Sequence, residues 1–348
     1  PFIMRHVFEQ LGVMDKVEFV QEHALYRLTI PNQIDITLPA SWSGIRKILQ
    51  ERFPLESENI DQFMLACEKV SVESFTTLPQ AQKNNSTELL EQFCPYFQRY
   101  GLRTAHDVLN EFFTDQTLIS IVAAYWFYSG VPPKELLFSD LAVMIYAYAI
   151  FKPWHIKGGS QAMSNALLES FLESGGEVRF NCSVDKIITA HQAVKSVKLE
   201  DGSEIQCKAV ISNASPILVF NEMLDQPSPL QVQQDFKSRR MGTSAFVIYL
   251  GLDCTPEQLN ITAPSTFISS TMDWSETYAN MQSFDSPISG MLTCYNFDDP
   301  DAAPQGKSQV VLVCLQYADV WEKVKAEDYA KTKYRFADEL INLIEQVY

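Results

Sequence analysis

Side chains that could carry out acid–base, metal or redox chemistry are present in this chain, but not at the spacings that such chemistry requires. The seven cysteines form no C-x-x-C pair, so neither a zinc site nor a redox motif is predicted. Carboxylates are abundant in a chain with a net charge of -16, and no pair of them stands out by its spacing. The histidines also lack metal-ligand spacing; they are His6, His23, His106, His155 and His191. We therefore expect no metal and name no catalytic side chain.

Two short features near residue 155 each have a chemical and a structural interpretation. His155 precedes Gly158 and could face a bound cofactor, but an ordinary surface or core histidine is the more frequent case. Residues 158–162, GGSQA, resemble the nucleophile elbow of a serine hydrolase. Such an elbow follows a strong apolar strand, and residues 154–157, WHIK, do not form one. A serine hydrolase is therefore not expected.

The glycines limit how this chain could bind a dinucleotide. A dinucleotide-binding turn uses G-x-G-x-x-G, because backbone N–H groups and a helix N-terminus there hold the pyrophosphate. The chain has 13 glycines, and no two of them are separated by a single residue. The phosphate-binding motif is therefore absent from these 348 residues.

Residues 157–214 contain two glycine pairs and the elements that would position a ligand bound by them. A helix is predicted after Gly158-Gly159 from an apolar stripe at helical spacing, and Gly175-Gly176 ends it. The period then falls to about two, which predicts a short strand at residues 178–180 and a meander beyond it. The expected turns of the meander are residues 191–193 and Asp201-Gly202, followed by a return strand over residues 205–211.

That order of parts resembles a segment of the flavin-dependent amine-oxidase-like superfamily. The closest branch is that of the phytoene desaturases, carotenoid isomerases and retinol saturases. The matching pattern is two glycine pairs around a helix, V-x-x-I on a strand, D-G, and V-I-S-N-A. In this chain these are Gly158-Gly159, Gly175-Gly176, Val184 with Ile187, Asp201-Gly202, and residues 210–214.

The resemblance implies a cofactor and the residues that contact it. In that family the segment belongs to the FAD domain, and the V-x-x-I strand lies against the adenine end of FAD. By position, Val184, Asn213, Ala214, Gly158 and Gly159 are the expected cofactor-binding residues. Because the phosphate-binding motif and a late glycine-rich flavin segment are absent, the resemblance implies a part of a longer protein.

Two apolar stretches are the candidates for a substrate wall. Residues 118–128 read as one helix, and residues 141–151, LAVMIYAYAIF, are apolar on every side. Such helices are more often plain core. The resemblance favours the wall of a tunnel for a long apolar substrate, or a face resting on a membrane. At least two of the expected substrate-binding residues should then line a cavity or patch; they are Trp126, Phe127, Tyr146 and Tyr148.

Length and composition set the remaining limits. The length suggests two domains. The acidic balance argues against nucleic acid as a partner. Scattered cysteines favour a reducing compartment, and neither a signal peptide nor an apolar run long enough to span a membrane is present. A cytoplasmic protein is expected, with peripheral contact to a membrane as an addition.

The combined expectation is an α+β fold: a mixed, largely antiparallel substrate-domain sheet covered by helices, beside an incomplete Rossmann-like portion with a β-meander. Residues 1–155 and 216–348 form the substrate domain, and residues 156–215 the partial FAD domain. The whole protein is expected to be an FAD-dependent oxidoreductase that desaturates, saturates or isomerises a long polyene or isoprenoid-like molecule. The alternatives are an amine- or porphyrinogen-oxidising relative, or a lipid-binding module without catalysis.

Overall fold

The computed structural model describes residues 2–84, 87–191, 193–239 and 242–348. The chain divides into two compact units, Pro1–Leu167 with Gly242–Tyr348 and Leu168–Met241, which we treat separately. The sequence placed the corresponding divisions at residues 155/156 and 215/216. The central residue of the predicted turn at 191–193, Gln192, lies outside the described residues.

The first unit is built on a mixed sheet, which has six strands in the described residues. Every neighbouring pair is antiparallel except β2 and β9, which are parallel, so the predicted largely antiparallel sheet is confirmed. In order across the sheet, the strands are β3 (Ile34–Pro39), β2 (Ala24–Ile30), β9 (Ser265–Ser269), β10 (Ser289–Cys294), β11 (Ser308–Tyr317) and β8 (Thr243–Leu252).

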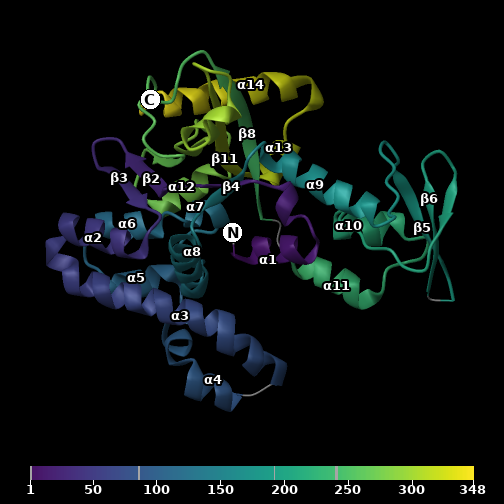
Figure 1. Ribbon diagram of the computed structural model, residues 1–348, viewed down its shortest axis with the longest axis horizontal. Helices are drawn as coiled ribbons and strands as arrows, with labels where there is room; N and C mark the ends of the chain where they lie inside the picture. Colours follow the sequence, from purple (N-terminus) through teal and green to yellow (C-terminus); the bar gives the residue numbers. More distant parts are fainter. Residues whose placement is uncertain (1, 85–86, 192, 240–241) are drawn as a thin grey trace. The chain divides into compact units, whose positions relative to one another are not determined.

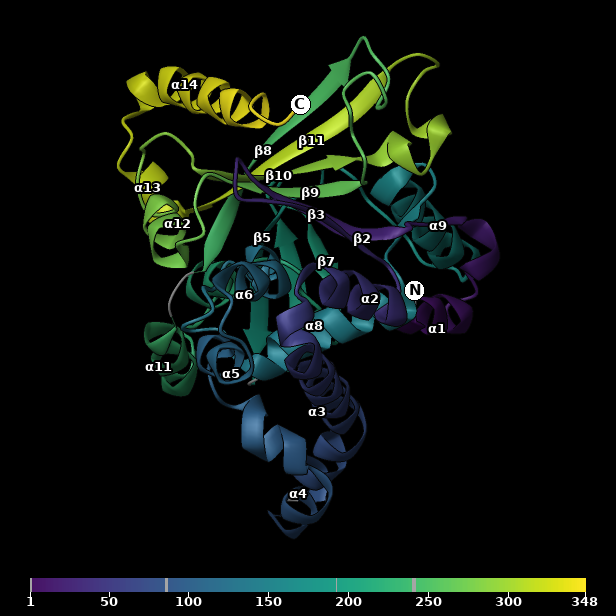
Figure 2. The same cartoon turned by 90° about the vertical axis from the view of Figure 1, so that its left-hand side faces the viewer.

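One face of this sheet is covered by the long helix α14 (Ala326–Ile344), which runs along it in Figure 2. Side chains alternate between the two faces of a strand. Leu312 and Cys314 therefore point toward α14, where they pack with Phe336 and Leu340. Burying each large apolar side chain contributes about 1.5–3 kcal/mol, so this contact fixes the helix on the sheet.

Helices cover the β2–β9 side of the opposite face. Tyr26 and Phe267, on neighbouring strands, are each 1% exposed and share one core with Phe63 and Phe138 of the helices. Figure 1 shows α3 and α8 among these helices. They are α2 (Trp42–Arg52), α3 (Ser57–Asn84), α5 (Ala105–Phe112), α6 (Gln116–Ala123), α7 (Trp126–Ser129) and α8 (Phe138–Phe151).

Local capping explains where several of these helices begin. The Ser41 hydroxyl accepts a hydrogen bond from the Gly44 N–H at the start of α2. The Asp115 carboxylate accepts from the Thr117 and Leu118 N–H groups at the start of α6. Each cap satisfies backbone donors that the first turn leaves without an intrahelical acceptor.

The helix α3 continues through Pro79 to Asn84, although residues 79–84 are rich in polar side chains. One sequence prediction about a helix was wrong. Residues 118–128 were expected to form one helix, but Ala124 and Tyr125 separate α6 from α7. An apolar stretch buried on all sides carries no periodic signal that would mark such a break.

Shorter elements complete the first unit. The strands β1 (Phe19–Gln21) and β4 (Trp154–Ile156) form an antiparallel pair beside the main sheet. The remaining short elements lie at the ends and in the connections of the unit. They are α1 (Phe2–Gln10), η1 (Met14–Lys16), η2 (Pro54–Glu56), α4 (Thr87–Phe93), η3 (Phe97–Gly101), α12 (Trp274–Asn280), η5 (Tyr295–Phe297), η6 (Pro300–Ala302) and α13 (Ala318–Glu322).

The second unit contains the predicted meander, which has three strands among its described residues in the order β5-β6-β7. They are β5 (Val184–Ala190), β6 (Ala193–Leu199) and β7 (Glu204–Gln206). The helix α9 (Gly159–Glu173) leads from the first unit into this one, and α10 (Pro216–Leu218), η4 (Val219–Met223) and α11 (Leu230–Ser238) follow the meander. No strand forms at residues 178–180, and β7 ends at Gln206 rather than continuing to residue 211.

Large apolar side chains of the second unit are exposed. Phe171 and Leu172 of α9 are 51% and 48% exposed, and Phe180 and Ile211 reach 74% and 101%. Of the α9 residues that the structure describes, Ala166 is the buried one. The apolar stripe of this helix, predicted from its spacing, is therefore present but not covered.

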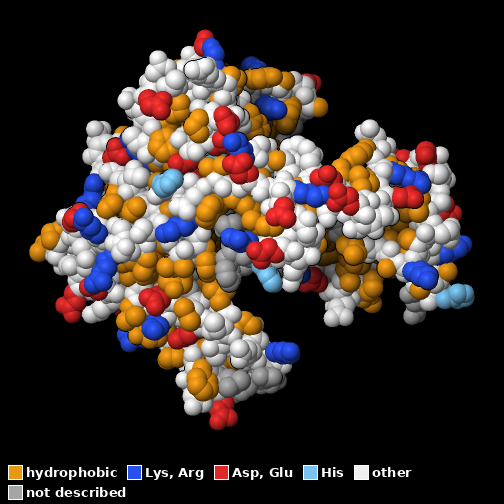
Figure 3. All heavy atoms as spheres, viewed as in Figure 1, with side chains coloured by type: hydrophobic (Ala, Val, Ile, Leu, Met, Phe, Trp, Pro, Cys, Tyr) orange, Lys and Arg blue, Asp and Glu red, His pale blue; other side chains and the backbone are white. Residues whose placement is uncertain are grey.

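The surface of the first unit also has apolar regions. Apolar side chains gather over α8 and the helices next to it in Figure 3. On α8, the side chains of Tyr148 and Ile150 are 39% and 41% exposed. Within the described ranges, no helix combines the length and the apolar character needed to cross a membrane.

Candidate functional site

The half of the sheet that the helices leave uncovered forms the floor of a large cavity. On β8, Ala245, Val247 and Tyr249 point away from α14, and on β11 Val311 and Val313 do the same. The cavity above them has a volume of 1140 Å³ and lies within the first unit. Its floor is therefore an apolar, pleated surface made by two long strands.

The walls come from four segments that lie next to this floor. Tyr148 of α8 forms part of the wall, and Trp154 and Ile156 of β4 form the next part. Phe19 pairs with Ile156 across the β1–β4 ladder and also lines the cavity. The turn into α9 supplies Gly158, Gly159, Ser160 and Met163.

The connection between α8 and β4 has an unusual backbone at the edge of the cavity. Lys152 has φ 64° and ψ 149°, a conformation that L residues rarely adopt. Its ammonium donates to the carbonyl of Ala149 at 3.0 Å and to that of Ala40. These two hydrogen bonds stabilise the strained turn. They also pair the Lys152 ammonium with backbone carbonyl oxygens.

A polar corner interrupts the apolar lining. The His155 ring lies between two carboxylates, with Nδ1 3.5 Å from Glu22 Oε1 and Nε2 3.8 Å from Asp299 Oδ2. Tyr295 approaches the same ring with a centroid separation of 6.1 Å. Burial raises the pKa of Glu22 above its ordinary value, and the nearby His155 opposes that shift. Sequence spacing did not reveal this corner.

Next to the polar corner, Lys157 forms ion pairs with two exposed carboxylates. The Lys157 ammonium lies 2.9 Å from Asp301 and 3.9 Å from Glu18. Asp299 Oδ1 accepts a hydrogen bond from the Asp301 N–H at 3.3 Å, which fixes the Asp299 side chain at the start of η6. Across the described ranges, no group of three or more His, Cys, Asp or Glu side chains is arranged to hold a metal ion.

The four expected substrate-binding residues do not lie together. Tyr148 lines the cavity and stacks on Tyr125 at 5.2 Å. Tyr146 is half-buried and packs edge-on against Trp42 at 5.2 Å. Trp126 and Phe127 are 1% and 6% exposed and belong to the core.

Of these four described side chains, Tyr148 alone lines the cavity, which is fewer than the two or more that the sequence predicted to line a cavity or patch. Trp126 stacks on Phe127 at 4.6 Å, and Phe127 stacks on Phe267 of the sheet at 5.5 Å. The aromatic density in residues 118–128 reflects contact between a helix and a sheet.

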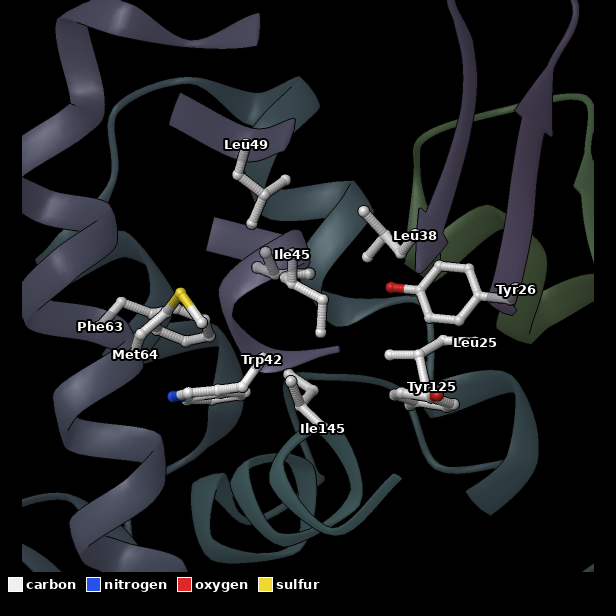
Figure 4. A pocket seen from close by; sticks show the side chains of 11 residues that line it. Leu25, Tyr26, Leu38, Trp42, Ile45, Leu49, Phe63, Met64, Tyr125 and Ile145 are labelled. Carbon is white, nitrogen blue, oxygen red and sulfur yellow. The ribbon is translucent and has the colours of Figure 1, made fainter. Parts of the chain in front are cut away.

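The pocket between the helices and the strands β2 and β3 is too small for a ligand. Figure 4 shows Trp42, Ile45, Tyr26, Tyr125 and Ile145 converging on one pocket. Its volume is about 10 Å³, no more than the space of one water molecule. The space for a ligand therefore lies over the uncovered strands β8 and β11 and not under the helices.

The second unit has a hollow of its own, which brings together three of the expected cofactor-binding residues. Val184, Asn213 and Ala214 all line it, and its volume is 620 Å³. The strand β5 pairs with β6 on one side, and on the other the described residues offer a single bridge from Ile187 to Leu224. The strand edge at Val184 is thus free to lie against a flat group.

Gly158 and Gly159 line the cavity of the first unit instead. Both have a positive φ, 78° and 72°, which a glycine adopts without strain. A Cβ added at Gly159 would meet nothing within 4 Å, so its backbone is bare toward the open side. The residues present suit contact with one end of FAD, whereas the motif for its phosphates is not in this chain.

Comparison with known proteins gives a family match over most of the chain. The sequence pattern of the family described as "Flavin containing amine oxidoreductase" matches residues 4–335. A prolycopene isomerase from Daucus carota is 23% identical over 95% of this chain and 54% of the relative. An all-trans-retinol 13,14-reductase from Danio rerio is 24% identical over 88% of this chain and 55% of the relative. The chain thus spans about half the length of the curated relatives that it matches.

Solved structures show the same fold at low sequence identity. An oxidoreductase from Methanosarcina mazei is 13% identical with a TM-score of 0.61, covering 95% of this chain and 67% of that one. A putrescine oxidase is 12% identical with a TM-score of 0.53, covering 97% and 67%. The α+β architecture expected from the sequence is therefore confirmed.

Proposed function

The chain belongs to the family of flavin-containing amine oxidoreductases, and on that premise we propose that the whole protein is an FAD-dependent oxidoreductase acting on a long apolar polyene or isoprenoid-like molecule. The reaction class is desaturation, saturation or isomerisation of carbon–carbon double bonds. Relatives named for prolycopene, retinol and phytoene support this class.

The observation that carries the proposal is the wide cavity on an apolar strand floor. Ligand pockets usually enclose roughly 300–1,000 Å³, and this one measures 1140 Å³. Val247, Val311 and Val313 would bury the apolar face of the substrate, at about 25 cal/mol per Å² removed from water. The Tyr148 ring would hold the chain of the substrate against this floor and exclude water from it.

We propose that FAD contacts the two sets of residues expected from the sequence. Val184, Asn213 and Ala214 would meet its adenine end, and Gly158 with the bare backbone of Gly159 would face another part of it. A bound flavin supplies hydride transfer, which no side chain of this chain provides. Residues 156–215 would then be part of an FAD domain, and residues 1–155 and 216–348 the substrate domain. The uncovered Phe180 and Ile211 are suited to packing against the rest of such a domain.

Flavin content tests this proposal. We expect the whole protein to purify with bound flavin. Anaerobic mixing with a polyene should reduce oxidised flavin if the reaction is a desaturation and oxidise reduced flavin if it is a saturation, whereas an isomerisation leaves the oxidation state of the flavin unchanged. The 348-residue chain alone should lose flavin in gel filtration, because it lacks the phosphate-binding motif.

A colourless whole protein that still binds apolar ligands would support the lipid-binding module instead. A flavoprotein that oxidises amines or porphyrinogens and ignores polyenes would support the other alternative. Flavin retained by the 348-residue chain at near-equal stoichiometry would contradict the placement of the phosphate site outside it.

Peripheral contact with a membrane is a further part of the proposal. The apolar surface over α8, to which the exposed Ile150 contributes, would rest on the lipid. Because the net charge is -16, we expect co-sedimentation with neutral vesicles and weaker co-sedimentation with anionic ones. If the protein binds neither neutral nor anionic vesicles, the proposed membrane contact is wrong.

A further inference from the structure

The polar corner of the cavity contains a histidine whose hydrogen-bonding capacity is not used by its neighbours. Neither ring nitrogen of His155 has a hydrogen-bond partner in the described part of the chain, and both atoms are buried. The side chain is 12% exposed, and it lines the cavity. Buried polar atoms are nearly always hydrogen-bonded in folded proteins, so these two call for an explanation.

The gap between His155 and Asp299 has a specific size. Nε2 and Oδ2 are 3.8 Å apart, which is too long for a direct hydrogen bond. An oxygen atom placed about 2.8 Å from each would bridge them, as hydrogen-bonded oxygens do. Asp299 Oδ1 is already engaged by the Asp301 N–H, so Oδ2 is the oxygen left to accept.

The chemistry of the two partners selects the bridging group. Asp299 is 5% exposed as a side chain and, as a carboxylate, only accepts hydrogen bonds. Burial raises the pKa of Glu22, and in its protonated form the Glu22 carboxyl donates to the facing Nδ1, which leaves the proton of the neutral imidazole on Nε2 as a donor. The bridging atom must therefore accept from one side and donate to the other. A hydroxyl does both, an ether or carbonyl oxygen only accepts, and a hydrocarbon does neither.

Both residues face a cavity whose floor is apolar, and this combination defines an amphipathic ligand. We propose that the substrate is an apolar molecule carrying a terminal hydroxyl group, and that its hydroxyl oxygen lies between His155 Nε2 and Asp299 Oδ2. This rests on the proposed function, and within it separates an alcohol from a hydrocarbon polyene. A carboxylate end is disfavoured, because it would bring a negative charge against Asp299.

Paired ligands that differ in one group test this inference. Dodecan-1-ol and its methyl ether share the alkyl chain and the oxygen, but the ether cannot donate. Displacement of Nile red from the whole protein with its flavin gives the two dissociation constants. We expect the preference for the alcohol to be at least about tenfold greater in the wild type than in His155→Phe, because hydrogen bonds to charged groups have this size. Dodecanoate should bind more weakly than the alcohol.

Two further variants complete the design. Asp299→Asn keeps the Oδ1 acceptor for the Asp301 N–H and should also lower the preference, so the test survives if His155→Phe does not fold. Asp285→Asn changes an exposed carboxylate that does not line the cavity, and should leave the preference unchanged. Equal preference in the wild type and both corner variants would overturn the inference alone, with water as the bridge. Failure of every dodecyl ligand to displace the dye would contradict the cavity assignment of the proposed function instead.

Discussion

Replacing Trp126 with alanine is expected to lower the free energy of unfolding by about 3–5 kcal/mol, the range measured for truncating a buried aromatic side chain. Trp126 is 1% exposed, and it stacks on Phe127, which in turn stacks on Phe267 of the sheet. The substitution leaves a cavity beside Phe127 in the core that this close packing cannot fill. Chemical denaturation of the 348-residue chain, followed by circular dichroism, measures the loss.

Tyr148→Ala is the matched control for this substitution. Tyr148 is 39% exposed and stacks on Tyr125, so its removal should cost no more than about 1.5 kcal/mol, the size of an aromatic pair. Because Tyr148 lines the cavity, this variant should bind long apolar ligands more weakly. The reverse pattern, a stable Trp126→Ala with weakened ligand binding, would restore the substrate contact that the sequence predicted for Trp126.

Ala245→Trp is expected to weaken the binding of a long-chain alcohol by about tenfold or more, which corresponds to 1.4 kcal/mol. Ala245 is exposed on the cavity floor, so the indole would occupy the space of the ligand without displacing the core. Nile red displacement from the whole protein measures the affinity.

The control is Ser244→Trp on the neighbouring residue of β8. Ser244 is also exposed, but its side chain points to the opposite face of the strand. It adds the same indole outside the cavity and should leave the affinity within threefold of the wild type. If both variants bind equally well, the ligand does not lie on this floor.

Local patterns predicted the elements that turns and periodicity define. The glycine pairs and Asp201-Gly202 marked the ends of α9 and the turn after β6, and the structure places them there. The resemblance grouped Val184 with Asn213, and one hollow contains both. The strand expected at residues 178–180 does not form, because alternation over a few residues says little without a partner strand.

The substrate-binding prediction shows what periodicity alone leaves open. The helix α8 is apolar on every side, so its pattern does not tell which face is covered. Residues two apart on a helix are rotated by about 200°, and Tyr146 and Tyr148 therefore face different neighbours. Tyr146 meets Trp42, and Tyr148 meets the cavity. Helical spacing alone could therefore have ruled out one of these two tyrosines as a substrate contact.

The polar corner could not have been predicted in this way. Glu22, His155 and Asp299 are far apart in the sequence, and only the pairing of β1 with β4 and the return of the chain after β10 bring them together. The floor left a weak signal: residues 244–252, SAFVIYLGL, carry apolar side chains on both faces. A strand at the edge of a sheet with two apolar faces needs a cover on each, and α14 covers one.

The central claim is that a polyene bound on the open face of β8 and β11 reacts with a flavin. The most direct measurement is the change in flavin absorption when the whole protein, wild type or Ala245→Trp, is mixed anaerobically with a polyene alcohol, once with its flavin oxidised and once with its flavin reduced. We expect both proteins to contain the same amount of flavin, and the change to be clearly smaller in Ala245→Trp than in the wild type at a ligand concentration near the wild-type dissociation constant. An identical change in both proteins, or none in a wild type that contains flavin, would contradict the account.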